Sequence, residues 1–368
     1  MRIDTRLCIG SLLLALASGG AARATDRLPR YDHILVIIAE NRGFQEIIGN
    51  ATAPKLNRLA ATYGLATEFF AEAHPSEGNY VAMLGGDTFG IHDDDAWYCK
   101  SGVADRHCPS ATTIQPYVDH TVTARSLVDQ LAERHLSWKG YFENIPAPGA
   151  KAVFFPDEQS PAAEMPNFLY ASKHNGFINF RTVQDDPALA RKLVGFDALI
   201  DDLASDQLPS YAHIVPNQCN DMHGLGETNI PADCFYRNKH ELIARGDEMI
   251  GDLVGKIQAS PAWSGRGNSA IVVTWDEDGD EGSDGSAPRG PQGCCGFDPK
   301  SSANFGGGHI PTLVITNHGP RHVTDNTPYN HYSLLRTTEE VFGIDEYLGH
   351  ANDAAAGVRS MTRLFQAR

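Results

Sequence analysis

Short runs of apolar, often β-branched residues alternate along this chain with amphipathic segments of helical length. An uninterrupted run such as HILVII, residues 33–38, is typical of a strand buried on both faces of a parallel sheet. The segment 239–257 instead repeats apolar residues with the period of a helix that packs one face on a core. We predict further strands at 66–70, 137–145, 210–217, 269–275 and 309–316, and further helices at 54–64, directly after Ser76, at 123–136 and at 331–343.

This order of elements predicts the fold class. Alternating strands and helices build an α/β domain, with a central, mostly parallel sheet and helices on both faces. Residues 90–117, 146–186 and 276–308 lack a clear period and are predicted to be long loops. Loops of this length in a compact domain are usually functional or disordered, and open α/β sheets bind ligands where their strands end. We therefore expect active-site loops at that edge.

The first 24 residues have the three-part pattern of a secretory signal peptide. Two arginines precede an apolar run from Cys8 to Ala17, and small residues follow up to Ala24. This run is too short for a stable membrane anchor, and no later run approaches the length of a membrane span. We predict a signal peptide at 1–24, a single domain at 25–368, and a periplasmic or secreted protein.

Charge and cysteine content narrow the classes of partner. The formal charge is −16, and it becomes −18 once the leader with its three Arg and one Asp is removed. Such an acidic chain is a poor candidate for nucleic-acid binding, which needs a basic surface. Export favours disulfides, and the pairs Cys99–Cys108 and Cys219–Cys234 each bracket a short polar loop. The adjacent Cys294 and Cys295 either form a vicinal disulfide or stay reduced.

Polar clusters follow or precede several predicted strands. They are Glu40–Asn41, Ser76, the segment 217–223 (NQCNDMH), and Asp276–Asp278 with the later His309. Carboxylates, an amide oxygen and imidazoles are ligands for divalent cations, and this mixture suits Ca, Mg, Mn, Fe or Zn. Three successive acids after a buried strand repel one another unless a cation lies among them. The pattern favours a metal site over a solvated acidic loop.

Ser76 lies on a turn bracketed by Pro and Gly, directly before a predicted helix. Serine is a favoured N-cap, so capping alone explains its position. The same position offers backbone N–H groups and the helix dipole to an anion, which suits a nucleophile that attacks phosphate.

Familiar catalytic motifs do not surround this serine. No GxSxG elbow, HExxH or phosphate-binding glycine loop occurs in the chain. The acidic run 276–287 fails as an EF-hand, because Glu281 and Ala287 stand where Gly and Glu are required. If Ser76 is a nucleophile, a metal is the available activator.

Five ordered motifs resemble the phosphoesterase family of bacterial and fungal acid phosphatases and phospholipases C, within the alkaline phosphatase superfamily. They are HILVIIAENRGFQEIIG, HPSEGNYVAMLGG, the TWDEDGD run, GGGHIPTLVITNHGP and YNHYSLLRTTEEVFGI, and they span about residues 32–344. The resemblance implies an alkaline-phosphatase-like α/β fold and a hydrolase of phosphoric esters.

The resemblance also implies roles for individual residues. Ser76 matches the family's Ser or Thr nucleophile, Asn79 would hold a phosphoryl oxygen, and His223 would act in catalysis. His74 and His331 are weaker candidates, for which a structural or packing role is an equal or better explanation. The metal ligands implied are Glu40, Asn41, Ser76, Asp221, Asp276, Glu277 and His309.

One position departs from the family pattern. Many relatives have Gln-Pro where this chain has Glu77-Gly78. A carboxylate beside the nucleophile opposes an anionic substrate unless it is turned away or protonated. This departure bears on substrate preference more than on mechanism.

From these features we expect an exported, metal-dependent phosphoesterase. It would hydrolyse phosphomonoesters of small substrates through a phosphoserine intermediate. A phospholipase C or a phosphoinositide phosphatase, acting on phospholipid head groups, is the alternative within the same class. An inactive cation-binding extracellular protein is the alternative from another class.

Overall fold

The uninterrupted apolar run near the N-terminus forms the middle strand of the central sheet. In the computed structural model, which describes residues 28–156, 168–226, 230–279, 293–296 and 306–366, this strand, β1, spans His33–Ala39. It pairs in parallel with β8 on one side and with β9 on the other. The predicted signal peptide lies outside the described residues.

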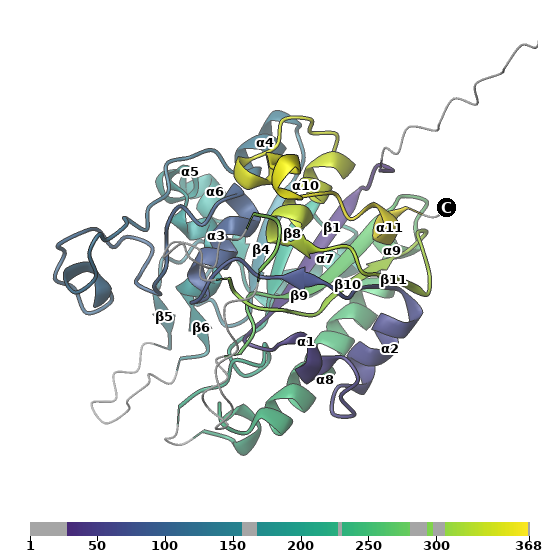
Figure 1. Ribbon diagram of the computed structural model, residues 1–368, viewed down its shortest axis with the longest axis horizontal. Helices are drawn as coiled ribbons and strands as arrows, with labels where there is room; N and C mark the ends of the chain where they lie inside the picture. The colour runs from purple at the N-terminus through teal and green to yellow at the C-terminus, as the bar shows by residue number, and fades with distance from the viewer. Residues whose placement is uncertain (1–27, 157–167, 227–229, 280–292, 297–305, 367–368) are drawn as a thin grey trace, which may run out of the picture.

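Eight strands form the central sheet, in the order β11-β2-β10-β9-β1-β8-β4-β7 (Figure 1). The five from β9 to β7 run parallel, which confirms the prediction of a mostly parallel sheet. Besides β1, the strands of this sheet are β2 (Gly64–Ala66), β4 (Trp138–Phe142), β7 (Leu193–Val194), β8 (Tyr211–Val215), β9 (Ser269–Trp275), β10 (Thr312–Thr316) and β11 (Val323–Asp325).

The predicted strand 309–316 forms β10, which is antiparallel to its neighbours. It pairs antiparallel with both β9 and β2 within the mostly parallel sheet. A parallel neighbour needs a crossover connection, usually a helix, and residues 276–308 contain no helical period. The antiparallel direction brings the start of β10 to the carboxyl end of β9.

The predicted strand 66–70 is divided between two sheets. Its first part lies in β2, while β3 (Phe69–Phe70) pairs with β12 (Tyr329–Asn330) in a separate two-stranded sheet. This pairing brings the segment that leads to Ser76 beside the start of the last long helix. A second two-stranded sheet joins β5 (Phe154–Phe155) to β6 (Tyr170–Ala171).

Helices cover both faces of the central sheet. On one face α3 packs against α10, and on the other α2 packs against α8 (Figure 1). Helix α4 is shorter than predicted, because Ser126 and Asp129 form a capping box at its start. The helices described are α1 (Phe44–Ile47), α2 (Pro54–Thr62), α3 (Glu77–Gly85), α4 (Leu127–Glu133), α5 (Arg181–Asp185), α6 (Pro187–Ala190), α7 (Phe196–Ser205), α8 (Lys239–Gln258), α9 (Pro261–Ser264), α10 (His331–Val341) and α11 (Thr362–Phe365).

Three disulfides fasten segments outside the sheet. Cys99–Cys108 and Cys219–Cys234 are joined as the sequence predicts, and the adjacent Cys294–Cys295 pair is joined as well. The Cys99–Cys108 disulfide closes a loop within residues 90–122. We call residues 90–122 the disulfide lobe. Among the described helices, none combines the length and the apolar character that crossing a membrane requires.

Candidate active site

The hydroxyl of Ser76 does not cap the helix that it precedes. Ser76 is the N-cap residue of α3, but its side chain makes no capping hydrogen bond and its backbone is helical, at φ −50° and ψ −47°. Its buried Oγ lies 3.2 Å from Glu40 Oε2 and 3.3 Å from Glu277 Oε1. The serine therefore faces two carboxylates that follow neighbouring strands, and the capping explanation does not describe it.

The amide of Asn79 holds the turn that carries Ser76. Its Oδ1 accepts hydrogen bonds from the backbone N–H groups of Glu72, at 2.9 Å, and Ala73, at 3.0 Å. Its Nδ2 donates to the carbonyl of Ala73 at 2.8 Å. These bonds give Asn79 a positioning contact in the turn, and its second N–H group is not engaged by them, so the contact with phosphate that the family resemblance implies stays a prediction.

Two strand ends supply the carboxylates, because the carboxyl ends of parallel strands share one edge of a sheet. Glu40 follows β1, and its Oε1 accepts a hydrogen bond of 2.6 Å from the hydroxyl of Tyr80. Asp276 follows β9, and its Oδ1 accepts one of 3.2 Å from the backbone N–H of Asn41. Asn41 itself adopts the left-handed conformation, at φ 53°, which asparagine tolerates better than most residues.

Two histidines complete this group, and one of them was not predicted. In the described residues, Glu40, His174 and His223 each offer a ligand atom within 4.8 Å of the others. His174 Nε2 lies 3.3 Å from Glu40 Oε1, and its Nδ1 lies 3.6 Å from Asp221 Oδ2. His223 is oriented by Gly224, whose carbonyl lies 2.7 Å from Nδ1 and leaves the other ring nitrogen for a ligand.

Several buried oxygens of this cluster lack a hydrogen-bond partner. They are Asn41 Oδ1, Asp221 Oδ2 and Asp276 Oδ2. Burial, together with the neighbouring Asp276 and Asp221, raises the pKa of Glu40 well above its usual range. Burial raises the pKa of Asp276 to about 6. A divalent cation would supply the missing partner, and carboxylates, an amide oxygen and imidazoles are ligands that such a cation accepts.

His74 and His223 differ in protonation. His74 Nδ1 lies 2.5 Å from Glu277 Oε2, and its Nε2 lies 3.2 Å from Asp278 Oδ1. Burial lowers the pKa of His74, but these two carboxylates outweigh it and raise the pKa to about 11. Burial and the nearby Lys173 lower the pKa of His223 to about 3. His74 is thus a partly exposed imidazolium, whereas His223 is a half-buried, neutral imidazole of the kind that binds metals.

A lysine ammonium lies beside this cluster. Lys173 Nζ lies 2.7 Å from Asp94 Oδ2, and its charge partly offsets the burial that raises the pKa of both Glu40 and Asp221. Lys173 and His174 both belong to the predicted loop 146–186, where no strand end or period marks them. A Lys-His pair in a long loop is the only signal that the sequence offers for them.

Two of the predicted histidines, His309 and His331, contact backbone carbonyl groups and not the carboxylates of the site. His309 Nε2 lies 2.8 Å from the carbonyl of Thr67, and its ring stacks on Phe44 and Phe70 at centroid distances of 4.6 and 5.1 Å. The buried His331 has its Nε2 3.0 Å from the carbonyl of Trp275. Both residues fix segments that lead into the site.

The backbone between Asp221 and His223 adopts a rare conformation. Met222 has φ 83°, which is unusual for any residue other than glycine. Its side chain packs on Gly246 of α8, where a Cβ atom would lie 2.4 Å from Met222 Cγ. Conformations of this kind persist where packing enforces them, and they concentrate at functional sites.

Comparisons with known proteins identify the family of this chain. A family model described as "Phosphoesterase family" matches residues 50–345. The phosphatidylinositol-3-phosphatase of Mycobacterium tuberculosis H37Rv is 28% identical over 331 residues, which are 90% of this chain and 83% of that protein. The phosphate-repressible acid phosphatase of Penicillium chrysogenum is 27% identical over 314 residues, which are 85% of this chain and 60% of that protein.

Solved structures share the fold at low sequence identity. A protein of the alkaline phosphatase superfamily from Vibrio parahaemolyticus superposes with a TM-score of 0.51 at 13% identity, over 88% of this chain and 69% of that one. A phosphonate monoester hydrolase of Agrobacterium radiobacter gives 0.50 at 12% identity, over 91% and 77% of the two chains. The α/β architecture of that superfamily is therefore the fold of this chain.

Proposed function

The chain belongs to the phosphoesterase family, and from that premise we propose that it is a metal-dependent phosphomonoesterase of the acid-phosphatase type, with Ser76 as its nucleophile. The observation that carries the proposal is the orientation of the Ser76 hydroxyl. It turns from the N–H groups of α3, which a capping serine would bind, toward Glu40 and Glu277. A serine that only capped the helix would not lie among these carboxylates.

The metal would be held by side chains from four parts of the chain. Glu40 and Asn41 follow β1, His174 ends the short turn Ser172–His174, His223 follows β8 with Asp221 beside it, and Asp276 follows β9. A divalent cation bound there would act as a Lewis acid, favouring the alkoxide of the serine and neutralising phosphoryl oxygens. The metal ligands proposed are Glu40, Asn41, His174, His223 and Asp276.

The side chains of this site supply the remaining steps. The N-terminal N–H groups of α3 and the ammonium of Lys173 would bind phosphoryl oxygens. Ser76 Oγ would attack phosphorus as its proton passes to Glu40 or Glu277, the carboxylates 3.2 and 3.3 Å away. The bond from phosphorus to the leaving oxygen would break as His74 protonates that oxygen.

The second half of the cycle reverses these roles. Neutral His74 would accept a proton from a water molecule that attacks the phosphoseryl group, and Ser76 would leave with the proton held by the carboxylate. We assign the acid to His74 in place of the predicted His223, because His74 is the protonated imidazole of the two.

We further propose that the protein is exported to the periplasm or the exterior as one domain over 25–368. Its three disulfides support this location, since disulfides persist in oxidising compartments. The predicted leader, with its short apolar run, supports it as well.

A phosphoinositide phosphatase is the second candidate function. The mycobacterial relative, named a phosphatidylinositol-3-phosphatase, matches across 83% of its length. The 3-phosphate of that lipid is a monoester, so the same nucleophile and acid would serve. A phospholipase C would instead cut a diester.

One set of assays separates these functions. Purified protein would be incubated separately with p-nitrophenyl phosphate, short-chain phosphatidylinositol 3-phosphate and p-nitrophenyl phosphorylcholine, with and without a chelator. The Ser76→Ala variant would be assayed in parallel. We expect hydrolysis of one or both monoesters that the chelator and the substitution abolish. Hydrolysis of the diester alone, or full activity of Ser76→Ala, would contradict the proposal.

A further inference from the structure

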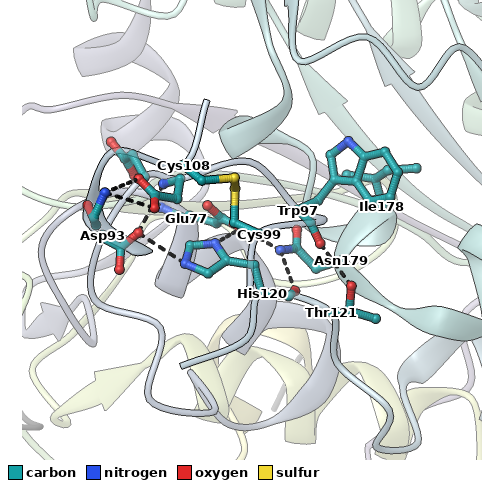
Figure 2. Close-up of polar contacts among 12 residues, drawn as sticks. Glu77, Asp93, Trp97, Cys99, Cys108, His120, Thr121, Ile178 and Asn179 are labelled. Atoms are coloured by element: carbon teal, nitrogen blue, oxygen red, sulfur yellow. Dashed lines mark hydrogen bonds and ion pairs between the residues drawn. A yellow bond between two sulfur atoms is a disulfide. The ribbon is translucent and has the colours of Figure 1, made fainter. Parts of the chain in front are cut away.

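The carboxylate of Glu77 lies in a second buried cluster, where it contacts His120 and Asn179 (Figure 2). Its Oε1 lies 3.0 Å from Nδ1 of His120 and accepts a hydrogen bond from Asn179. The other ring nitrogen of His120, Nε2, lies 3.0 Å from Asp93 Oδ1. We call the three residues Glu77, His120 and Asp93 the imidazolium bridge.

The bridge is nearly balanced in charge. Nδ1 of His120 shares a hydrogen bond with Glu77, and Nε2 forms an ion pair with Asp93 at 3.0 Å that lacks the geometry of a hydrogen bond. The side chain of His120 is fully buried, and that of Glu77 is 1% exposed. Burial lowers the pKa of His120, but Glu77 and Asp93 raise it to about 10. The ring thus provides a fixed internal cation between two acids.

The bridge also joins the start of α3 to the disulfide lobe. Asp93 and His120 lie toward the two ends of this lobe, and the backbone N–H of His120 donates to the carbonyl of Cys99, within the disulfide, at 3.1 Å. Packing is close here, because a Cβ atom on Gly78 would lie 2.9 Å from the carbonyl oxygen of Ile91. The position of the lobe therefore sets the position of the first turn of α3.

We propose that His120 is a positioning residue for Ser76, which holds the Glu77 carboxylate out of the phosphate site and fixes the first turn of α3. The inference rests on the proposed function. Without the ring, Glu77 would lose a buried hydrogen-bond partner, and its carboxyl group would be free to turn toward the phosphate site, where its charge would repel a phosphate dianion. The turn would also lose the contact that keeps the serine facing its carboxylates.

A double-mutant cycle between His120 and Glu77 tests this role. For His120→Gln we expect kcat/KM for p-nitrophenyl phosphate to fall about 100-fold, with a clear rise in KM, as a misplaced nucleophile and a nearby charge would cause. Glu77→Gln removes the charge but keeps an oxygen that accepts hydrogen bonds from His120 and Asn179. We therefore expect kcat/KM to fall only a few-fold. The kcat/KM of the double variant should be at least about tenfold higher than that of His120→Gln.

Asp93→Asn provides a gentler variant in case His120→Gln does not fold. It keeps the contact between Glu77 and His120 but weakens the one between His120 and residue 93. We therefore expect kcat/KM to fall about tenfold, again with a rise in KM. Asp105→Asn is the matched control, because Asp105 lies in the same lobe but contacts Tyr98 and His107. It should leave kcat and KM unchanged.

Binding of inorganic phosphate to the metal-loaded protein, measured by calorimetry, distinguishes a failure of the proposed function from a failure of the role proposed for His120. A wild-type protein that neither binds phosphate nor hydrolyses the ester overturns the proposed function and the bridge with it. Wild-type activity together with unchanged kcat and KM in folded His120→Gln or Asp93→Asn overturns the bridge alone. Recovery in the double variant, which a merely structural histidine would not give, supports it.

Discussion

Two clusters of buried carboxylates flank the first turn of α3, and they differ in how their charge is balanced. The imidazolium bridge places a protonated histidine between Glu77 and Asp93. The other cluster, which we call the strand-end cluster, gathers Glu40, Asp221, Asp276 and Glu277 beside Ser76. There His74 pairs with Glu277, but the buried oxygens Asp221 Oδ2 and Asp276 Oδ2 have no hydrogen-bond partner among the described residues.

This difference separates a structural cluster from a functional one. Buried acids that are paired by the protein's own cation stabilise one arrangement of the chain, because breaking such a pair is costly. Buried acids that repel one another have shifted pKa values and invite an external cation, and clusters of that kind concentrate at active sites. Buried carboxylates thus have opposite roles on the two sides of one turn: Glu40 and Glu277 face the hydroxyl of Ser76, whereas Glu77 is held away from it by His120.

The largest expected effect is the loss of activity when the strand-end cluster loses an acid. Asp276→Asn should lower kcat at least about 1,000-fold together with the bound metal, because a ligand of a Lewis acid is removed. In a chelator its resistance to urea should equal or exceed that of wild type, because one repelling charge is gone. Metal analysis, kinetics and urea unfolding measure the three quantities.

Asp93→Asn gives the opposite pattern in the bridge. Its stability in the same chelator should fall, because His120 loses a buried partner. If Asp276→Asn kept its metal and its activity, or if both variants changed stability in the same direction, the contrast between the clusters would be wrong.

The pH dependence of stability sharpens the comparison. In metal-free protein the pKa of Asp276 is raised to about 6 and that of Glu277 to about 8, mainly by burial. The folded state holds these protons more tightly than the unfolded state, so their contribution is complete below the usual pKa values near 4. It is lost as pH rises through about 8. Urea unfolding in a chelator should show stability falling across this window, and added metal should remove the fall.

The bridge should respond over a higher range of pH. The pKa of His120 is raised from 6.5 to about 10, so its stabilisation is complete below 6.5 and is lost as pH approaches 10. In the metal-loaded protein the decline should therefore begin above neutral pH, and His120→Gln should abolish it. An unchanged decline in that variant would assign it to other groups.

Lys173 lies between the two clusters and should affect substrate binding. It pairs with Asp94 and also interacts electrostatically with Glu40 and Glu277. Lys173→Gln should raise KM about tenfold with a smaller change in kcat, because a charge that binds phosphoryl oxygens is lost. Lys151→Gln, at an exposed lysine, is the control. Equal KM values in both variants would remove Lys173 from the site.

The smallest effect is expected from a methyl group behind the strand-end cluster. Gly246→Ala would press on Met222 and shift the segment that carries His223. We expect kcat to fall a few-fold, since small displacements of positioned groups cost rate. The matched control is Gly255→Ala on the same helix, where a Cβ atom meets nothing within 4 Å. That variant should be as active as wild type, and equal losses in both would point to the helix itself.

The sequence predicts those parts of the site that depend on strand geometry. Glu40 and Asp276 follow buried parallel strands, so their proximity follows from the fold class alone. His174 could not be predicted to join them, because its loop has no period and its position depends on tertiary packing. The sequence likewise brings His309 to the correct edge, but only packing decides that its ring lies between Phe44 and Phe70.

The position of Glu77 shows the same limit. Its partner His120 is 43 residues away, in the disulfide lobe. The sequence offered two resolutions for a carboxylate beside the nucleophile, turned away or protonated, and the structure shows it turned away and paired. A contact of that kind depends on how the disulfide lobe packs against the start of α3, which no periodicity describes.

The central claim is that Ser76 carries the phosphoryl group, and covalent trapping tests it most directly. Metal-loaded enzyme would be mixed with p-nitrophenyl phosphate, quenched in acid within its first turnovers and digested for peptide mass spectrometry. The account predicts a phosphate on Ser76 in the peptide containing HPSEGNY, absent from the Ser76→Ala protein. An unmodified peptide from actively turning-over enzyme, or phosphate on a histidine, would contradict it.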